Sequence, residues 1–106
     1  MATKKNTHIL TLIGRLAKQR TQIFSVARAD RDRTLTPEEI ARQDALASVI
    51  AHITPESSTD RAVLADIAYE RVERLSEGHG TQEDIQVAYA ALRSLWSARP
   101  EHKRAA

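Results

Sequence analysis

Apolar residues recur along this chain at the spacing of amphipathic helices, in four segments separated by polar loops. In the first segment the apolar residues share one face of a helix predicted over residues 7–28, with Asn6 or Thr7 as its N-cap. These apolar residues are Ile9, Leu12, Ile13, Leu16, Ile23, Phe24 and Ala27. Because this segment is the longest, we expect the other three to pack against it.

Two signatures of a helix start precede the second and fourth segments. Thr36-Pro37-Glu38-Glu39 combines a capping box with proline at the first helical position, and predicts a helix over residues 37–53. Thr81-Gln82-Glu83-Asp84 is a similar start, and predicts a helix over residues 82–98. The similarity between these two segments, which lie 45 residues apart, indicates either two related helical hairpins or two helices that use the same efficient start signal.

The third helix is predicted over residues 58–76, after the break at Pro55 and before Gly78, the expected C-terminal glycine. Thr54, Ser57 and Ser58 are the candidate caps. One side of this helix is apolar, with Leu64, Ile67, Ala68, Val72 and Leu75. The opposite side forms an acidic ridge of carboxylates three or four residues apart, which are Asp66, Glu70, Glu73 and Glu77.

Each remaining helix also has an apolar side that we expect to be buried. In the second helix this side is Leu46, Val49, Ile50 and Ile53, and in the fourth it is Ile85, Ala88, Tyr89, Leu92, Leu95 and Trp96. The sequence therefore predicts an all-α fold, a small antiparallel four-helix bundle, as one domain over residues 1–106. Residues 1–6 are expected to be flexible and residues 100–106 disordered. A pair of helical hairpins that completes its core as a homodimer is the competing architecture.

Composition agrees with a helical bundle, because 42% of the residues are hydrophobic but only 4% are aromatic. The absence of cysteine excludes disulfides, thiol catalysis and cysteine-bound zinc. We find no signal-peptide pattern and no apolar run of membrane-spanning length, so we expect a cytoplasmic protein without a membrane partner.

Charge is distributed unevenly along the chain. Through Arg33 there are eight Lys and Arg residues against two Asp, whereas residues 34–98 carry five Arg against eleven carboxylates. The basic first third and the acidic middle are expected to attract each other, within one molecule or between two.

No cofactor, metal ion or small-molecule substrate is inferred. The segment from Asp30 to Glu39 resembles half of an EF-hand loop, but Arg28 and Arg33 occupy positions that calcium binding requires to be aspartate and glycine. The four histidines lack helical pairing, and no serine lies in a nucleophile motif. We therefore expect that the protein is not an enzyme.

Arginines interrupt the apolar sides of three helices, at Arg20, Arg42 and Arg71. Each could extend its head group to water along the edge of the seam, or could meet a carboxylate across a helix interface. We favour the second role for Arg20 alone, where it would fix register within the bundle or between chains.

These features favour a small non-enzymatic interaction or regulatory protein that acts through helix–helix contacts, with self-association as the expected contact. The candidate interface residues are Arg15, Lys18, Arg20, Asp66, Glu70, Arg71, Glu73 and Glu77. The alternative is a nucleic-acid-associated accessory protein that uses the basic N-terminal third, with Lys4, Lys5, Arg15, Lys18, Arg28, Arg31 and Arg33 near phosphate.

Overall fold

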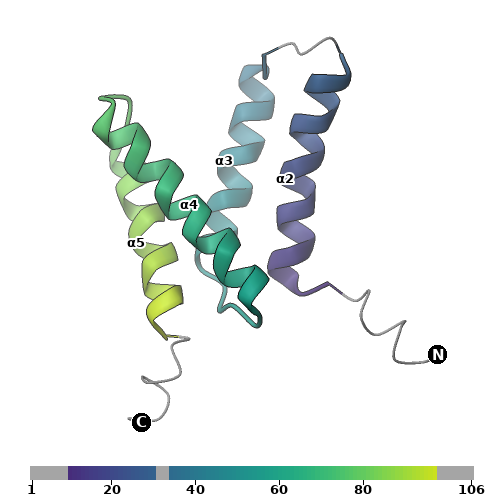
Figure 1. Cartoon of the computed structure of the whole chain (residues 1–106). Coiled ribbons are helices and arrows are strands. Elements are labelled where there is room, and N and C mark those ends of the chain that lie inside the picture. The colour runs from purple at the N-terminus through teal and green to yellow at the C-terminus, as the bar shows by residue number, and fades with distance from the viewer. Residues whose placement is uncertain (1–9, 31–33, 98–106) are drawn as a thin grey trace, which may run out of the picture.

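The structure, a computed structural model, describes residues 10–30 and 34–97 and has only helices in this part of the chain. They are α2 (Leu12–Ala29), α3 (Pro37–Ala51), α4 (Ser58–Ser76) and α5 (Gln82–Ser97). Consecutive helices run antiparallel, so α2–α3 and α4–α5 form two hairpins (Figure 1). The predicted all-α, four-helix architecture is confirmed. None of these helices has both the length and the apolar character needed to cross a membrane.

The two hairpins pack together at one end and diverge at the other, so the molecule has the outline of a V (Figure 1). Helix α4 packs along α5 and α2 packs along α3, while α3 also contacts α4 and α5. Helices α2 and α5 make no contact within the described residues. The bundle is therefore flat, with extents of 44 × 40 × 16 Å, and open between its outer helices.

The hydrophobic core lies where the hairpins meet and takes residues from all four helices. Its members are Ile13, Ala47, Ile50, Ala51, Leu64, Ile67, Ala68, Val87, Ala90 and Ala91. Half of these residues are alanines, which let helix backbones approach closely. Leu16, Ile53, Val63 and Leu95 pack against the edge of this core.

Side-chain caps begin the last three helices. Thr36 Oγ1 accepts a hydrogen bond from the Glu39 amide at 3.1 Å and the Glu39 carboxylate accepts one from the Thr36 amide at 2.9 Å, which confirms the capping box. Thr81 and Asp84 make the same reciprocal pair at 3.2 and 2.9 Å. Ser57 caps α4 by accepting from the Asp60 amide at 3.1 Å.

The predicted start of the first helix at residue 7 is wrong, because α2 begins at Leu12. Thr11 is its N-cap in an extended conformation, with Oγ1 accepting from the Gly14 amide at 3.0 Å and donating to Asp60 at 2.7 Å. This long-range bond holds the helix start against α4. Helix α4, with 19 residues, is consequently longer than α2, with 18. The candidate caps Asn6 and Thr7 lie outside the described residues, as do residues 1–6 and 100–106.

The C-terminal ends of α3 and α4 are set by backbone hydrogen bonds between nearby residues. Helix α3 ends at Ala51, two residues before the predicted 53, because the His52 and Ile53 amides turn to bond carbonyls three residues back. Helix α4 covers the predicted 58–76, and Gly78 follows it with φ +83. The His79 and Gly78 amides bond to the Arg74 and Leu75 carbonyls, which is a Schellman motif.

The expected burial of the bulky residues of α5 is wrong. Tyr89, Leu92 and Trp96 are exposed, and the buried face of the helix carries Val87, Ala88, Ala90 and Ala91 instead. Small side chains allow α5 to lie close to both α3 and α4, and this turns its aromatic flank outward. Residues expected in the apolar sides of the other helices are also about half exposed, namely Leu12, Phe24, Val49 and Val72.

Candidate interaction surfaces

Three arginines and three carboxylates from all four helices form one ion cluster between the hairpins. The members are Arg20 of α2, Asp44 of α3, Glu70, Arg71 and Arg74 of α4, and Asp84 of α5. The formal charges cancel within this ion cluster. Charged side chains can be buried when each has an oppositely charged partner, as in this cluster.

Arg71 is the centre of the ion cluster, with only 1% of its surface exposed. Its Nη1 donates to Glu70 at 3.2 Å and its Nη2 to Asp44 at 3.3 Å. The Nε lies 3.3 Å from Asp84 Oδ1, an ion-pair distance without hydrogen-bond geometry. Burial lowers the pKa of Arg71, and the Arg74 charge adds to this, while Asp44, Glu70 and Asp84 oppose it.

Arg74 links the same two aspartates from the solvent side. Its Nη2 donates to Asp44 at 3.1 Å and its Nη1 to Asp84 at 3.2 Å. Burial acts to lower the pKa of Arg74, but the hydrogen bonds and charges of Asp44 and Asp84 outweigh it and raise that pKa. Helices α3, α4 and α5 are thereby joined through paired side chains.

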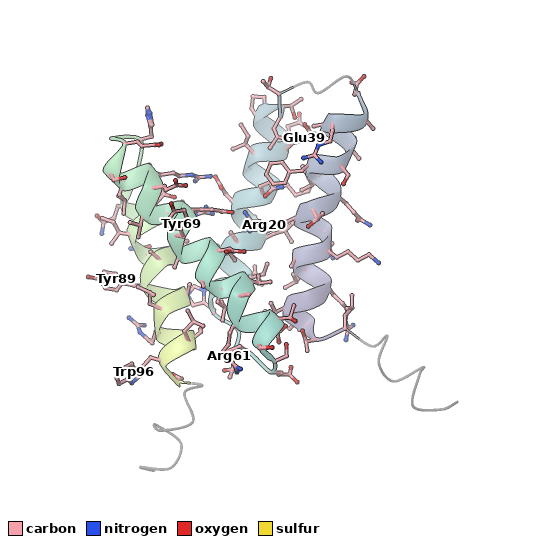
Figure 2. The ribbon with its side chains drawn as sticks, viewed as in Figure 1. Arg20, Glu39, Arg61, Tyr69, Tyr89 and Trp96 are labelled. Carbon is pink, nitrogen blue, oxygen red and sulfur yellow. The ribbon has the colours of Figure 1, made fainter. Side chains whose placement is uncertain are left out.

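Arg20 adds α2 to the ion cluster and lies between the hairpins (Figure 2). Its Nη2 donates to Glu70 at 3.0 Å and its Nε to the Gln43 side chain at 3.0 Å. The Gln43 amide donates back to the Arg20 carbonyl at 2.8 Å. Arg20 therefore meets a carboxylate across a helix interface within the chain. Arg71 does so too, although sequence reasoning favoured this role only for Arg20.

The structure does not join the predicted basic stripe to the acidic ridge. Arg15 and Lys18 are exposed on α2, and neither forms an ion pair within the described residues. Within the acidic ridge, Glu70 forms ion pairs in the ion cluster, whereas Asp66, Glu73 and Glu77 are exposed. Of the eight predicted interface residues, Arg20, Glu70 and Arg71 thus stabilise the chain itself, and five are available at the surface.

An apolar strip covers the outward flank of the α4–α5 hairpin. It consists of Tyr69 and Val72 of α4 with Ile85, Tyr89, Leu92 and Trp96 of α5, and is called the outer strip below. The four α5 residues are spaced 4, 3 and 4 apart, which places them on one helix face. Figure 2 shows Tyr89 and Trp96 projecting from α5 away from α2 and α3.

Exposure in the outer strip is high for large apolar side chains. Tyr69 is 64% exposed, Tyr89 63% and Trp96 54%. The strip residues come from α4 and α5, which pack along each other. The sequence pattern assigned Val72 and the four α5 residues of the strip to buried sides, and it did not include Tyr69.

A cleft of about 240 Å³ lies in the opening of the V and is called the inter-hairpin cleft below. Its lining combines apolar side chains from the α2–α3 hairpin with charged ones from α4. The lining residues are Arg20, Phe24, Leu35, Ile40, Gln43, Asp44, Glu70, Glu73, Arg74 and Glu77. A second hollow lies on the other side of the Asp44–Arg74 ion pair, against α5.

Metal binding finds no support in the described part of the chain, where no group of three or more His, Asp or Glu side chains could hold an ion. Glu39, the last residue of the EF-hand-like segment, is committed to the capping box of α3. Asp32 of that segment lies outside the described residues.

The sequence and the fold were also compared with known proteins. No protein-family model matches the chain, and no curated protein or solved structure is detectably similar to it. The function must therefore be argued from the surfaces described above.

Proposed function

We propose that this protein is a small non-enzymatic interaction protein that acts through helix–helix contacts, and that it associates with itself through the outer strip. The observation that carries the proposal is the exposure of Tyr69, Tyr89 and Trp96 with their aliphatic neighbours on one face. Contiguous apolar surface of this kind on a small protein marks an interaction site.

The size of the outer strip suits a specific interface. Aromatic side chains present roughly 150–250 Å² each, so three of them about 60% exposed give roughly 350 Å². Val72, Ile85, Leu92 and the polar rim add to this surface. Two copies in contact would then bury about 700 Å² of aromatic surface, and the aliphatic and rim residues raise the total toward about 1,200 Å², the lower end of the range for specific protein interfaces.

Charge around the outer strip favours a second copy as the partner. Arg61 and Glu73 are exposed near opposite ends of the strip, about 18 Å apart along α4. In a two-fold symmetric, antiparallel arrangement Arg61 of each copy would oppose Glu73 of the other. A symmetric dimer requires a self-complementary surface of this kind. The apolar residues would supply most of the affinity, because exposed ion pairs contribute little.

The test is the oligomeric state of the full chain, measured by sedimentation velocity between about 1 and 200 µM, the range in which a modest interface dissociates. The wild-type protein is expected to sediment as a dimer at the upper concentrations. Tyr89→Glu introduces a charge into the centre of the outer strip and is expected to give a monomer at all of them.

Gln86→Glu is the matched control, because it adds the same charge at an exposed position of the same helix outside the outer strip. It is expected to dimerise as the wild type does. Circular dichroism of both variants checks that the helices are retained. A wild-type monomer at 200 µM, or a Tyr89→Glu variant that dimerises normally, would refute self-association through this strip.

A further inference from the structure

The inter-hairpin cleft has two chemically different walls. Phe24, Leu35 and Ile40 form an apolar wall on the α2–α3 side, and Glu73 and Glu77 line the α4 side. We propose that this cleft binds a cationic amphipathic helix of a partner protein. The cleft lies outside the apolar residues of the outer strip, although Glu73 borders both, and the proposal does not depend on self-association.

The α4 wall carries negative charge that no described residue neutralises. Arg20 and Arg74 both line the cleft, but they are paired with Glu70, Asp44 and Asp84 in the ion cluster. Glu73 and Glu77 take part in no ion pair within residues 10–30 and 34–97. Carboxylates spaced three or four residues apart on a helix repel each other. A bound cation would relieve this repulsion, so the site favours lysine or arginine.

The opposite wall supplies surface for apolar contact. Phe24 is 48% and Ile40 45% exposed, and Leu35 lies between them in sequence in the loop before α3. These side chains come from the hairpin facing Glu73 and Glu77, so a ligand must present apolar and cationic groups on neighbouring faces. An amphipathic helix with a basic flank meets this requirement, whereas a purely cationic or purely apolar segment meets half of it.

The spacing of the un-neutralised carboxylates suits a helical ligand. Glu73 and Glu77 lie one turn of α4 apart, about 6 Å, so matching cations would be three or four residues apart on the ligand. The described part of the protein has no strand to which an extended peptide could add. A helix inserted between the diverging hairpins would also separate their unpacked ends from water and complete the open bundle.

The test is fluorescence anisotropy with the full-length protein and a labelled synthetic 18-residue helix of leucine and lysine. A second peptide replaces every lysine by glutamate. The lysine peptide is expected to bind, and the glutamate peptide is expected to bind at least tenfold more weakly. Glu73→Gln/Glu77→Gln is expected to weaken lysine-peptide binding about fivefold or more, and Ile40→Ser by a similar factor.

Matched controls separate this cleft from other surfaces. Val49→Ser removes an apolar side chain that is 54% exposed on the same helix as Ile40 but outside the cleft lining, and is expected to leave binding within about twofold. Glu38→Gln/Glu56→Gln removes two exposed carboxylates elsewhere, again with little effect. Tyr89→Ser tests for peptide bound at the outer strip.

Several outcomes would overturn the proposal. Equal binding of both peptides, or loss of binding in Tyr89→Ser but not in Ile40→Ser, would show that the peptide does not recognise the cleft. If Ile40→Ser, which leaves the outer strip intact, changes the sedimentation of the protein but not peptide binding, a second copy occupies the cleft. These results are distinguishable from failure of the outer-strip proposal, which rests on Tyr89→Glu.

Discussion

The ion cluster makes one strong prediction about stability, tested by replacing Arg71 with methionine. Methionine has nearly the length of the arginine stem but carries no charge and no donor. The substitution therefore removes the contacts to Glu70, Asp44 and Asp84 at 3.2–3.3 Å while keeping much of the packing. Asp84 is the most buried of the three carboxylates, with only 9% of its side chain exposed.

The expected loss follows from what remains after the change. Removing one partner of a buried charge pair costs about 3–5 kcal/mol, because the other charge is left buried and unpaired. Here Arg74 still binds both Asp44 and Asp84, so the lower end applies and we expect about 3 kcal/mol. For a domain of this size, this corresponds to a decrease in Tm of about 12–24 °C.

Urea denaturation followed by circular dichroism at 222 nm measures the free energy of unfolding directly. Arg42→Met is the matched control, since Arg42 is exposed on α3, lies outside both proposed interfaces and has no ion pair within the described residues. It is expected to change the free energy of unfolding by less than about 0.5 kcal/mol. Both variants are compared at the same protein concentration, because association would add to the apparent stability.

The reasoning would be refuted if Arg71→Met were as stable as the wild type or more stable. Hydrophobic replacement of a whole buried ion set can be neutral or stabilising, but replacement of one member leaves a net negative charge in the cluster. A stable Arg71→Met variant would therefore mean that Arg20 and Arg74, with water, satisfy the three carboxylates. The ion cluster would then not hold the four helices together.

Four further measurements test individual parts of the fold. Arg20→Leu is expected to lower the free energy of unfolding by about 2 kcal/mol, because Glu70 loses a partner; unchanged oligomeric state with equal or higher stability would contradict the register role of Arg20. Gly78→Ala should cost about 1–2 kcal/mol in urea denaturation because φ is +83, and Gly78→Asn less, since asparagine tolerates this conformation; equal costs would argue against the backbone explanation. Thr36→Ala should cost about 1 kcal/mol by removing the α3 cap, while Thr36→Ser retains it, and a fully stable alanine variant would show the cap to be dispensable. Fluorescence of Trp96, the single tryptophan, should shift to shorter wavelength as protein concentration rises, and a constant spectrum would place it outside the self-association interface.

A helix end can be predicted from the sequence when contacts between nearby residues set it. Thr36 with Glu39 and Thr81 with Asp84 satisfy backbone groups three residues away, so their pattern is visible in the sequence. Gly78 acts equally locally through its positive φ. The start of α2 was missed because Thr11 is fixed by Asp60, which is 49 residues away in sequence and therefore invisible to a local pattern.

The sequence by itself determined the all-α class, the helical segments after residue 36 and the acidic ridge, because periodicity and capping act over a few residues. Only the tertiary structure decided which apolar flank of each helix was buried. The apolar arc of α5 includes both alanines and aromatic residues, and close approach to α3 and α4 favoured the small side chains, leaving Tyr89 and Trp96 outside. The partners of Arg71 were likewise set by packing, since Asp44 and Asp84 reach it from helices that approach only in the folded chain.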